Sequence, residues 1–195
     1  QGKEPTIITI NSKEVTESFQ KSFQAQWDQE TRIVKGLDAI QDLFEEMLEH
    51  GHVDLIGARG YFMDERREWI DKVWKPKAIK KGFTMRNLVD PGTYGHYITK
   101  LPFAETRYGL PKEFSPLSVF WIIKNKVAIS NWVGEEPVVT IIENKQFYEI
   151  YKKQFESLWN QEVQTYEGLK GMEVAFQEAL DATPKGSETY VYGAG

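Results

Sequence analysis

Cysteine is absent from this sequence of 195 residues, and histidine occurs only three times. The absence of cysteine excludes disulfides and every site that needs a thiolate as nucleophile or metal ligand. It fits a reducing compartment, so we expect the protein in the cytoplasm. The residues that remain lead us to predict no cofactor.

Positive charge and long apolar runs are also scarce. The chain carries 24 Lys and Arg against 29 Asp and Glu, which gives a formal net charge of -5. Because binding to phosphates needs clustered basic side chains, this balance argues against a broad nucleic-acid footprint. No apolar run approaches the ~20 residues that cross a bilayer, so we predict no membrane contact. The length suits one domain with appendages.

A passage near the N-terminus returns 132 positions later. Residues 5–48 align with residues 137–180 without a gap, and 14 of the 44 paired positions are identical. The identical pairs include Trp27 with Trp159, Gly36 with Gly168, and Phe44 with Phe176. Such self-similarity indicates a repeated structural unit. Since the chain does not begin with Met, we expect it to be an excised segment. The repeat predicts either that it is cut from a tandem array or that its two ends together rebuild a partial second unit.

Both copies predict the same order of elements. β-branched runs at residues 6–10 and 138–142 predict strands. Apolar residues at helical spacing follow each run, and then Gly36 or Gly168 predicts a short break before a second helix. The stretches "VDLIGA" and "TYVYGA" close the copies as predicted strands.

The parts that occur once lie between the two copies. They predict a helix over 66–81 with a break near Pro76, a strand within 83–90 and a hairpin that turns at Asn125. The predicted organisation has three parts: the tail of a preceding repeat unit (strand plus helix) at 1–32, a complete α/β unit at 33–160, and the head of a following unit (helix plus strand) at 161–195.

Several stretches of the central unit resemble a known family. The stretches "LIGARG", "WKPKAIKKGFTMRNL" and "LPKEFSPLSVFWIIKNKVAISNW" follow the order found in the phospholipase-D-like effector domain of archaeal transcription regulators of the TrmB type. The resemblance implies an α/β fold in which a mixed sheet is flanked by helices, here with partial repeat units at both ends, and pairing of units about a two-fold axis. It also implies sensing rather than chemistry. A winged-helix DNA reader would lie elsewhere, so nucleic acid would be contacted only through a domain outside this chain.

Catalytic members of the phospholipase D superfamily carry a His-x-Lys-x4-Asp motif, in which the His attacks phosphorus and the Lys neutralises charge. None of the three histidines here is followed two positions later by Lys. The positions that align with the three catalytic residues hold Leu117, Val119 and Lys124. We therefore predict that the chain is not an enzyme; an enzyme of unrecognised mechanism is the alternative.

The stretch from His50 to Asp54, "HGHVD", has the spacing of some metal ligands. The matching stretch of the second copy, "TPKGSET", has no comparable set of ligands. We therefore favour an exposed polar turn over a metal site and predict no bound metal.

A ligand site is predicted where strands end, because open α/β sheets bind ligands beyond the carboxyl ends of their strands. The predicted ligand-binding residues are Gly57, Arg59, Gly60, Asp64, Ser130, Asn131 and Trp132. The glycines would let the backbone approach a ligand, Arg59 would clamp an anion, and Asn131 would supply an amide. The alternative is a tight turn in which Arg59 pairs with Asp64.

These observations predict a non-catalytic ligand-sensing and dimerisation module of a transcription regulator, which binds a small polar or anionic metabolite and forms a homo-oligomer. A structural role is the alternative. The incomplete units at both ends cannot bury their apolar faces alone, so they would pair within or between chains and form swapped oligomers or filaments.

Overall fold

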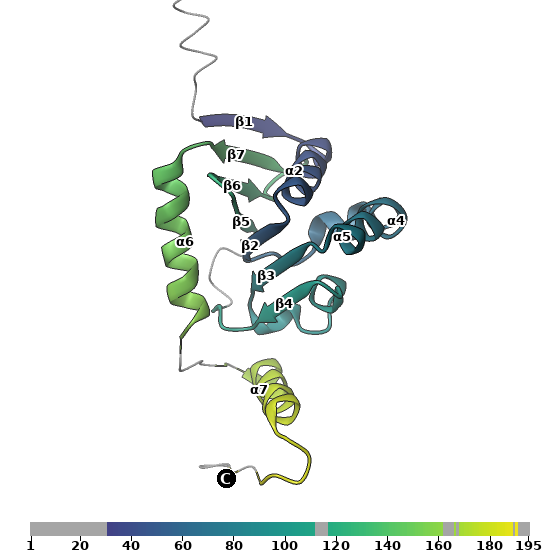
Figure 1. The fold of residues 1–195 in the computed structure, drawn as a ribbon, viewed down its shortest axis with the longest axis vertical. Coiled ribbons are helices and arrows are strands. Elements are labelled where there is room, and N and C mark those ends of the chain that lie inside the picture. Colours follow the sequence, from purple (N-terminus) through teal and green to yellow (C-terminus); the bar gives the residue numbers. More distant parts are fainter. Residues whose placement is uncertain (1–30, 112–116, 162–165, 167, 189, 191–195) are drawn as a thin grey trace, which may run out of the picture.

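A seven-stranded mixed sheet with helices on both faces forms the body of the protein (Figure 1). The computed structural model describes residues 31–111, 117–161, 166, 168–188 and 190. The strands are β1 (Thr31–Lys35), β2 (His52–Ile56), β3 (Thr84–Leu88), β4 (Ala104–Arg107), β5 (Ser118–Ile123), β6 (Lys126–Asn131) and β7 (Val138–Ile142). The α-helices are α2 (Leu37–His50), α3 (Tyr61–Glu65), α4 (Arg67–Trp69), α5 (Lys75–Lys81), α6 (Lys145–Trp159) and α7 (Gly168–Ala182).

The strand order is β1-β7-β6-β5-β2-β3-β4. Strand β2 runs parallel to β3, and β3 runs parallel to β4, whereas the other neighbours are antiparallel. The α/β class and the mixed sheet flanked by helices, both predicted from the sequence, are therefore confirmed.

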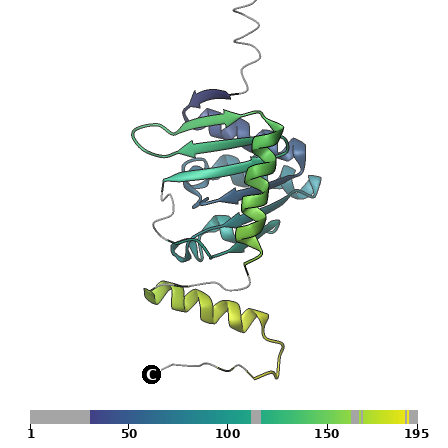
Figure 2. The ribbon, with the colours of Figure 1, turned by 90° about the vertical axis from the view of Figure 1, so that its left-hand side faces the viewer.

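The two faces of the sheet have different covers. Helix α2 and the helical segment α3–α5 lie over one face, and α6 crosses the other (Figures 1 and 2). Because side chains alternate along a strand, Val53 and Leu55 of β2 join the core under α2, whereas Asp54 and Ile56 point toward α6.

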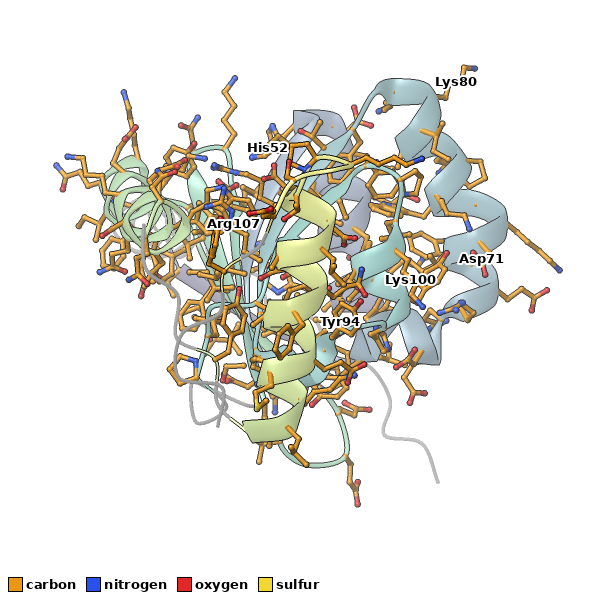
Figure 3. The ribbon with its side chains drawn as sticks, turned by 90° about the horizontal axis from the view of Figure 1, so that it is seen from below. His52, Asp71, Lys80, Tyr94, Lys100 and Arg107 are labelled. Carbon is orange, nitrogen blue, oxygen red and sulfur yellow. The ribbon has the colours of Figure 1, made fainter. Side chains whose placement is uncertain are left out.

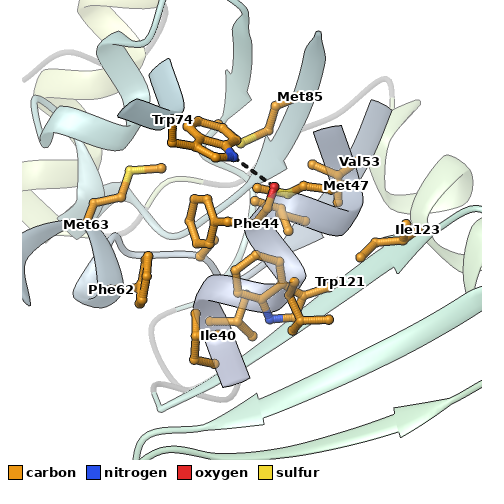
Figure 4. Packing of buried hydrophobic residues seen from close by; sticks show 14 of the residues in the cluster. Ile40, Phe44, Met47, Val53, Phe62, Met63, Trp74, Met85, Trp121 and Ile123 are labelled. Carbon is orange, nitrogen blue, oxygen red and sulfur yellow. Dashed lines mark hydrogen bonds between the residues drawn. The ribbon is translucent and has the colours of Figure 1, made fainter. Parts of the chain in front are cut away.

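Aromatic side chains form the centre of the core under α2 (Figure 4). The ring of Phe44 lies 4.7 Å from that of Phe62 and 5.0 Å from that of Trp74, measured between centroids. The indole Nε1 of Trp74 donates a hydrogen bond of 2.8 Å to the carbonyl oxygen of Phe44. This contact satisfies the one polar atom of a fully buried tryptophan.

The helix predicted over 66–81 begins earlier, at Tyr61, and contains a π-helical turn at Ile70–Trp74. Pro76 occupies the first turn of α5, directly after that turn. Proline has no N–H, and its ring would clash with the carbonyl four residues earlier. The irregularity in the helix is therefore the π-helical turn just before Pro76, close to the position where a break was predicted.

Two further predictions have different outcomes. The hairpin of β5 and β6 turns at Asn125, which has a left-handed φ of 63°, as predicted. Strand β1 was not predicted: a short break between helices was expected there, but residues Thr31–Lys35 pair antiparallel with β7. The strand and helix predicted within residues 1–30 lie outside the described residues, as does most of "TYVYGA". The three-part domain organisation stays a prediction.

Helix α7 lies beyond β4, at the sheet edge opposite β1 (Figure 1). Its buried residue Val174 forms a small cluster with Val89 and Tyr108, against which Tyr94 packs. Figure 3 shows α7 beside Tyr94 from below. In the part of the chain that the structure describes, no helix is both long and apolar enough to span a bilayer.

Candidate functional site

The loop after β2 contains three of the predicted ligand-binding residues, Gly57, Arg59 and Gly60, and a fourth, Asp64, lies in the following helix α3. The amide of Gly57 donates to the carbonyl of Leu88 at 2.8 Å, which ties the loop to the end of β3. Gly60 has a φ of 91°, and a Cβ atom at this position would lie 2.2 Å from Cε1 of His96. Glycine is required here both by the backbone conformation and by the close approach of the imidazole ring.

Arg59 and Asp64 have separate partners. The Nε of Arg59 donates to Oδ2 of Asp90 at 2.7 Å, and Oδ1 of Asp90 also accepts from the amide of Gly92 at 2.9 Å. Oδ2 of Asp64 lies 3.1 Å from Nε2 of His96. The pair of Arg59 with Asp64, considered as the alternative to a ligand clamp, is therefore replaced by Arg59 with Asp90. An anion would have to compete with Asp90 for this guanidinium.

The other three predicted residues lie at the end of β6. Ser130 is fully buried and its hydroxyl accepts a 2.9 Å hydrogen bond from Nε1 of Trp121. Asn131 accepts through Oδ1 from the hydroxyl of Ser118. The ring of Trp132 lies 5.7 Å from that of Tyr61, and its Nε1 is buried without a partner among the described residues.

A small cavity brings part of the predicted set together. Gly60 and Trp132 line it along with Tyr61 and Trp121, and its volume is about 20 Å³. That is room for roughly one water molecule. The structure thus places two of the seven residues at one cavity, while Arg59, Asp64 and Asn131 are engaged with neighbouring side chains. As a ligand site, the set of seven stays a prediction.

A larger pocket lies on the opposite face of the sheet, between the sheet and α6. Its volume is about 310 Å³, the lower end of the range for small-molecule sites. The rings of Phe120 and Tyr151 stack with centroids 5.9 Å apart within its wall. Among the described residues, the lining consists of Ile56, Phe120, Tyr151, Gln154, Ser157 and Leu158. Because Ile56 ends β2, this pocket also opens near the carboxyl end of a central strand, but residues on α6 were not predicted for it.

A cluster of charged side chains, which the sequence analysis did not identify, joins α6 to the sheet. Asp54 of β2 is 1% exposed. It accepts from Nε of Arg86 at 2.7 Å and from Lys152 of α6, and it lies 2.9 Å from Nε2 of His52. Glu156 of α6 completes the cluster with a 2.6 Å contact to Nη2 of Arg86. We call these five residues the α6 charge cluster.

The pKa values in the α6 charge cluster follow from these contacts. Burial raises the pKa of Asp54, but hydrogen bonds from His52, Arg86 and Lys152 outweigh it and lower the pKa to about 2. The hydrogen bond from Arg86 likewise lowers the pKa of Glu156. Both carboxylates are therefore ionised at neutral pH and hold α6 against the sheet. One sequence signal pointed here: Asp54 is the only charged residue in an otherwise apolar strand stretch, "VDLI".

The stretch "HGHVD" takes part in this cluster through His52 and Asp54. Nδ1 of His52 lies 2.7 Å from the hydroxyl oxygen of Thr84, so both imidazole nitrogens have protein partners. Among the described residues, no group of three or more His, Asp or Glu side chains is placed to hold a metal ion. His50 ends α2, Gly51 forms a turn and His52 begins β2, so the expected exposed turn is limited to the first residues of the stretch, and Asp54 is buried.

Comparison with known proteins gives matches only among solved structures. No protein-family model matches the sequence, and no curated protein matches it. The chain is similar to TrmBL2, described as an archaeal chromatin protein with a novel mode of DNA binding, at 15% identity and a TM-score of 0.44. This match covers 75% of the present chain and 60% of TrmBL2.

Two further similar structures come from bacteria. NucT from Helicobacter pylori matches at 12% identity and a TM-score of 0.47, over 69% of this chain and 98% of NucT. Nuc from Salmonella typhimurium, a phospholipase D family member, matches at 15% identity and a TM-score of 0.45, over 70% of this chain and 98% of Nuc. These likenesses concern the arrangement of strands and helices alone.

One expectation is corrected by these matches. The sequence predicted that the chain is not an enzyme, but a structure to which it is similar belongs to the phospholipase D family, which is named for an enzyme. The prediction is therefore contradicted, since the fold of this chain does not set it apart from enzymes of that family.

Proposed function

We propose that the chain is a ligand-sensing module of a transcription regulator of the TrmB type, and that the ligand binds in the pocket between the sheet and α6. The pocket of about 310 Å³ is the observation that carries this proposal. It is large enough for a small metabolite, whereas the cavity at Gly60 and Trp132 holds about one water molecule. Any contact with DNA would come through a domain outside this chain.

The lining defines the class of ligand. Phe120 and Tyr151 offer stacked aromatic faces, while Gln154 and Ser157 offer one amide and one hydroxyl. None of the lining residues that the structure describes is charged. This chemistry suits a flat or apolar body with one or two uncharged polar groups, such as a nucleoside or a sugar ring, since sugars pack their apolar face on aromatic rings. It suits the polar ligand predicted from the sequence better than the anionic one.

Ligand binding there would act on α6. Four of the six lining residues belong to α6, and the other two belong to β2 and β5. A ligand that prefers one placement of α6 would shift the population toward that placement, by as much as its difference in affinity.

Thermal unfolding in the presence of nucleosides, sugars and phosphoesters tests the ligand site. At least one uncharged compound should raise the unfolding temperature, and Ser157→Trp, which fills the pocket from an exposed position, should abolish the shift. Lys153→Trp is the matched control, because residue 153 is an exposed α6 residue outside the lining. A shift that survives in Ser157→Trp, or the absence of any shift across the panel, would contradict this site.

Self-assembly is a second candidate function, and α7 favours it. Its apolar residues Leu169, Met172, Phe176 and Leu180 are between 51% and 86% exposed. Exposed apolar patches of this kind are uncommon on monomeric proteins and mark interaction surfaces. Light scattering of the chain over a range of concentrations tests this function, which requires the mean mass to rise with concentration.

A further inference from the structure

The internal repeat indicates what the exposed face of α7 is built to contact. Helix α7 is the counterpart of α2 in the gapless alignment. Helix α2 follows Gly36, and α7 begins at Gly168. Both glycines have a φ in the left-handed region, 89° and 71°. The four exposed apolar residues of α7 match α2 residues that pack into the main core. The pairs are Leu169 with Leu37, Met172 with Ile40, Phe176 with Phe44, and Leu180 with Leu48.

The two helices use opposite faces to contact the body of the protein. In α2, Ile40, Phe44 and Leu48 are at most 3% exposed, and Asp42 on the other side faces solvent. In α7, the counterpart of Asp42 is Val174, which is fully buried against Val89 and Tyr108. Helix α7 is thus held by the side that α2 turns to solvent, and its α2-like core face is left open.

The chain contains a segment with the matching pattern. In the complete unit, the core around α2 includes Val139 of β7. The other copy of that strand lies at residues 6–10, where Ile7 is the counterpart of Val139. Residues 13–27 are likewise the counterpart of α6, and Phe23 and Trp27 match Phe155 and Trp159, which are 0% and 4% exposed. The N-terminal segment therefore carries the strand and helix patterns that accompany an α2-like helix in the complete unit.

The positions of the two ends favour contact between molecules. The N-terminal segment directly precedes edge strand β1 in the sequence, whereas α7 lies beyond the other edge strand, β4 (Figure 1). Seven strands at ~4.8 Å spacing place these edges roughly 30 Å apart. A contact that joins two different surfaces at opposite ends is heterologous, so it continues from one molecule to the next unless the rotation closes a ring.

We propose that the apolar face of α7 binds residues 5–30 of a second copy of this chain, so that the two incomplete repeats build one composite unit across a head-to-tail contact. This deepens the self-assembly function above and rests on it. The strand pattern at 6–10 would occupy the place that β7 has relative to α2, and the pattern at 13–27 would occupy the place of α6.

Two substitutions in the full chain test the contact. Phe176→Asp places a charge on the α7 face, and Ile7→Asp places one on the N-terminal segment. Each variant alone should keep the mass of a single chain at concentrations where the unmodified chain forms multiples. Ile79→Asp is the matched control, because Ile79 of α5 is 55% exposed, close to the 51% of Phe176. This variant should assemble as the unmodified chain does.

Mixing the two variants separates this contact from other modes of assembly. Each variant retains one intact surface, so an equimolar mixture should form a complex of two chains and no larger species. Pairing of α7 with α7 would leave Ile7→Asp fully associated, and closure within one molecule would leave the unmodified chain monomeric. Either result overturns the proposed contact. If the Phe176→Asp variant alone assembles as well as the unmodified chain, the contact is overturned while self-assembly stands. A strictly monomeric unmodified chain removes both.

Discussion

The two faces of the sheet are held by different interactions. Under α2, the contacts are almost entirely apolar, and Trp74 and Phe44 share a buried hydrogen bond within them. Under α6, Phe155 and Trp159 also pack in an apolar cluster, but the α6 charge cluster adds ion pairs to this contact, and a pocket of about 310 Å³ remains beside it. The comparison teaches that the first face is held by apolar packing, while the second face combines apolar packing with a buried polar anchor and leaves room for a ligand.

The largest effect on stability is expected on the apolar face. Trp74→Ala removes a fully buried indole and its hydrogen bond to Phe44, and should lower the free energy of unfolding by about 3 to 5 kcal/mol. Urea denaturation followed by circular dichroism measures it. If Trp74→Ala lost less unfolding free energy than Asp54→Ala, the α6 face and not the α2 face would contribute more to stability.

The second effect concerns the α6 charge cluster. Asp54→Ala leaves Arg86 and Lys152 without their shared carboxylate, and should cost about 2 to 3 kcal/mol, because both cations are partly exposed and water compensates part of the loss. Glu156→Ala is the control on the same cluster; its side chain is 37% exposed, so its loss should be smaller. Equal losses for the two variants would show that burial of Asp54 does not matter.

The third effect is a dependence of stability on pH. The pKa of Asp54 is about 2 in the folded protein against an ordinary value of 3.8. Its contribution to stability is therefore complete above about pH 4 and is lost as the pH falls toward 2, by about 2 kcal/mol in total. Unfolding free energies of the unmodified chain and Asp54→Asn should converge over this range. A constant difference between them from pH 6 to pH 2 would refute the assigned pKa.

The smallest effect on stability is expected from an exposed ion pair that contacts neither face of the sheet. Glu68 of α4 and Lys72 of the following π-helical turn are in contact, with side chains 79% and 71% exposed. Lys72→Ala should change the free energy of unfolding by less than about 0.5 kcal/mol, because solvent screens such pairs. A change comparable to that of Asp54→Ala would mean that the charge of a pair, rather than its burial, determines its contribution.

The sequence predicted best what depends on local pattern. The β5–β6 hairpin turns at Asn125 as expected, and the repeat correctly predicted that a helix follows Gly168, just as α2 follows Gly36. Strand β1 escaped prediction because "TRIVK" mixes charged with apolar residues, as edge strands do, and because its partner β7 is over 100 residues away.

The candidate site was harder to predict for the same reason. Arg59 was expected either to bind a ligand or to pair with nearby Asp64, but it pairs with Asp90 at the end of the neighbouring strand. Asp54 gathers Arg86 from another strand and Lys152 from α6. The strand order determines which of these side chains lie close together, and it cannot be predicted from the spacing of residues in the sequence.

The pairing of β1 with β7 also has a consequence for synthesis of the chain. Strand β1 emerges from the ribosome long before β7 exists, yet residues 6–10, which repeat the β7 pattern, are already present. The sheet can therefore reach its full strand order only after Val138–Ile142 has been made, and until then β1 lacks its native partner.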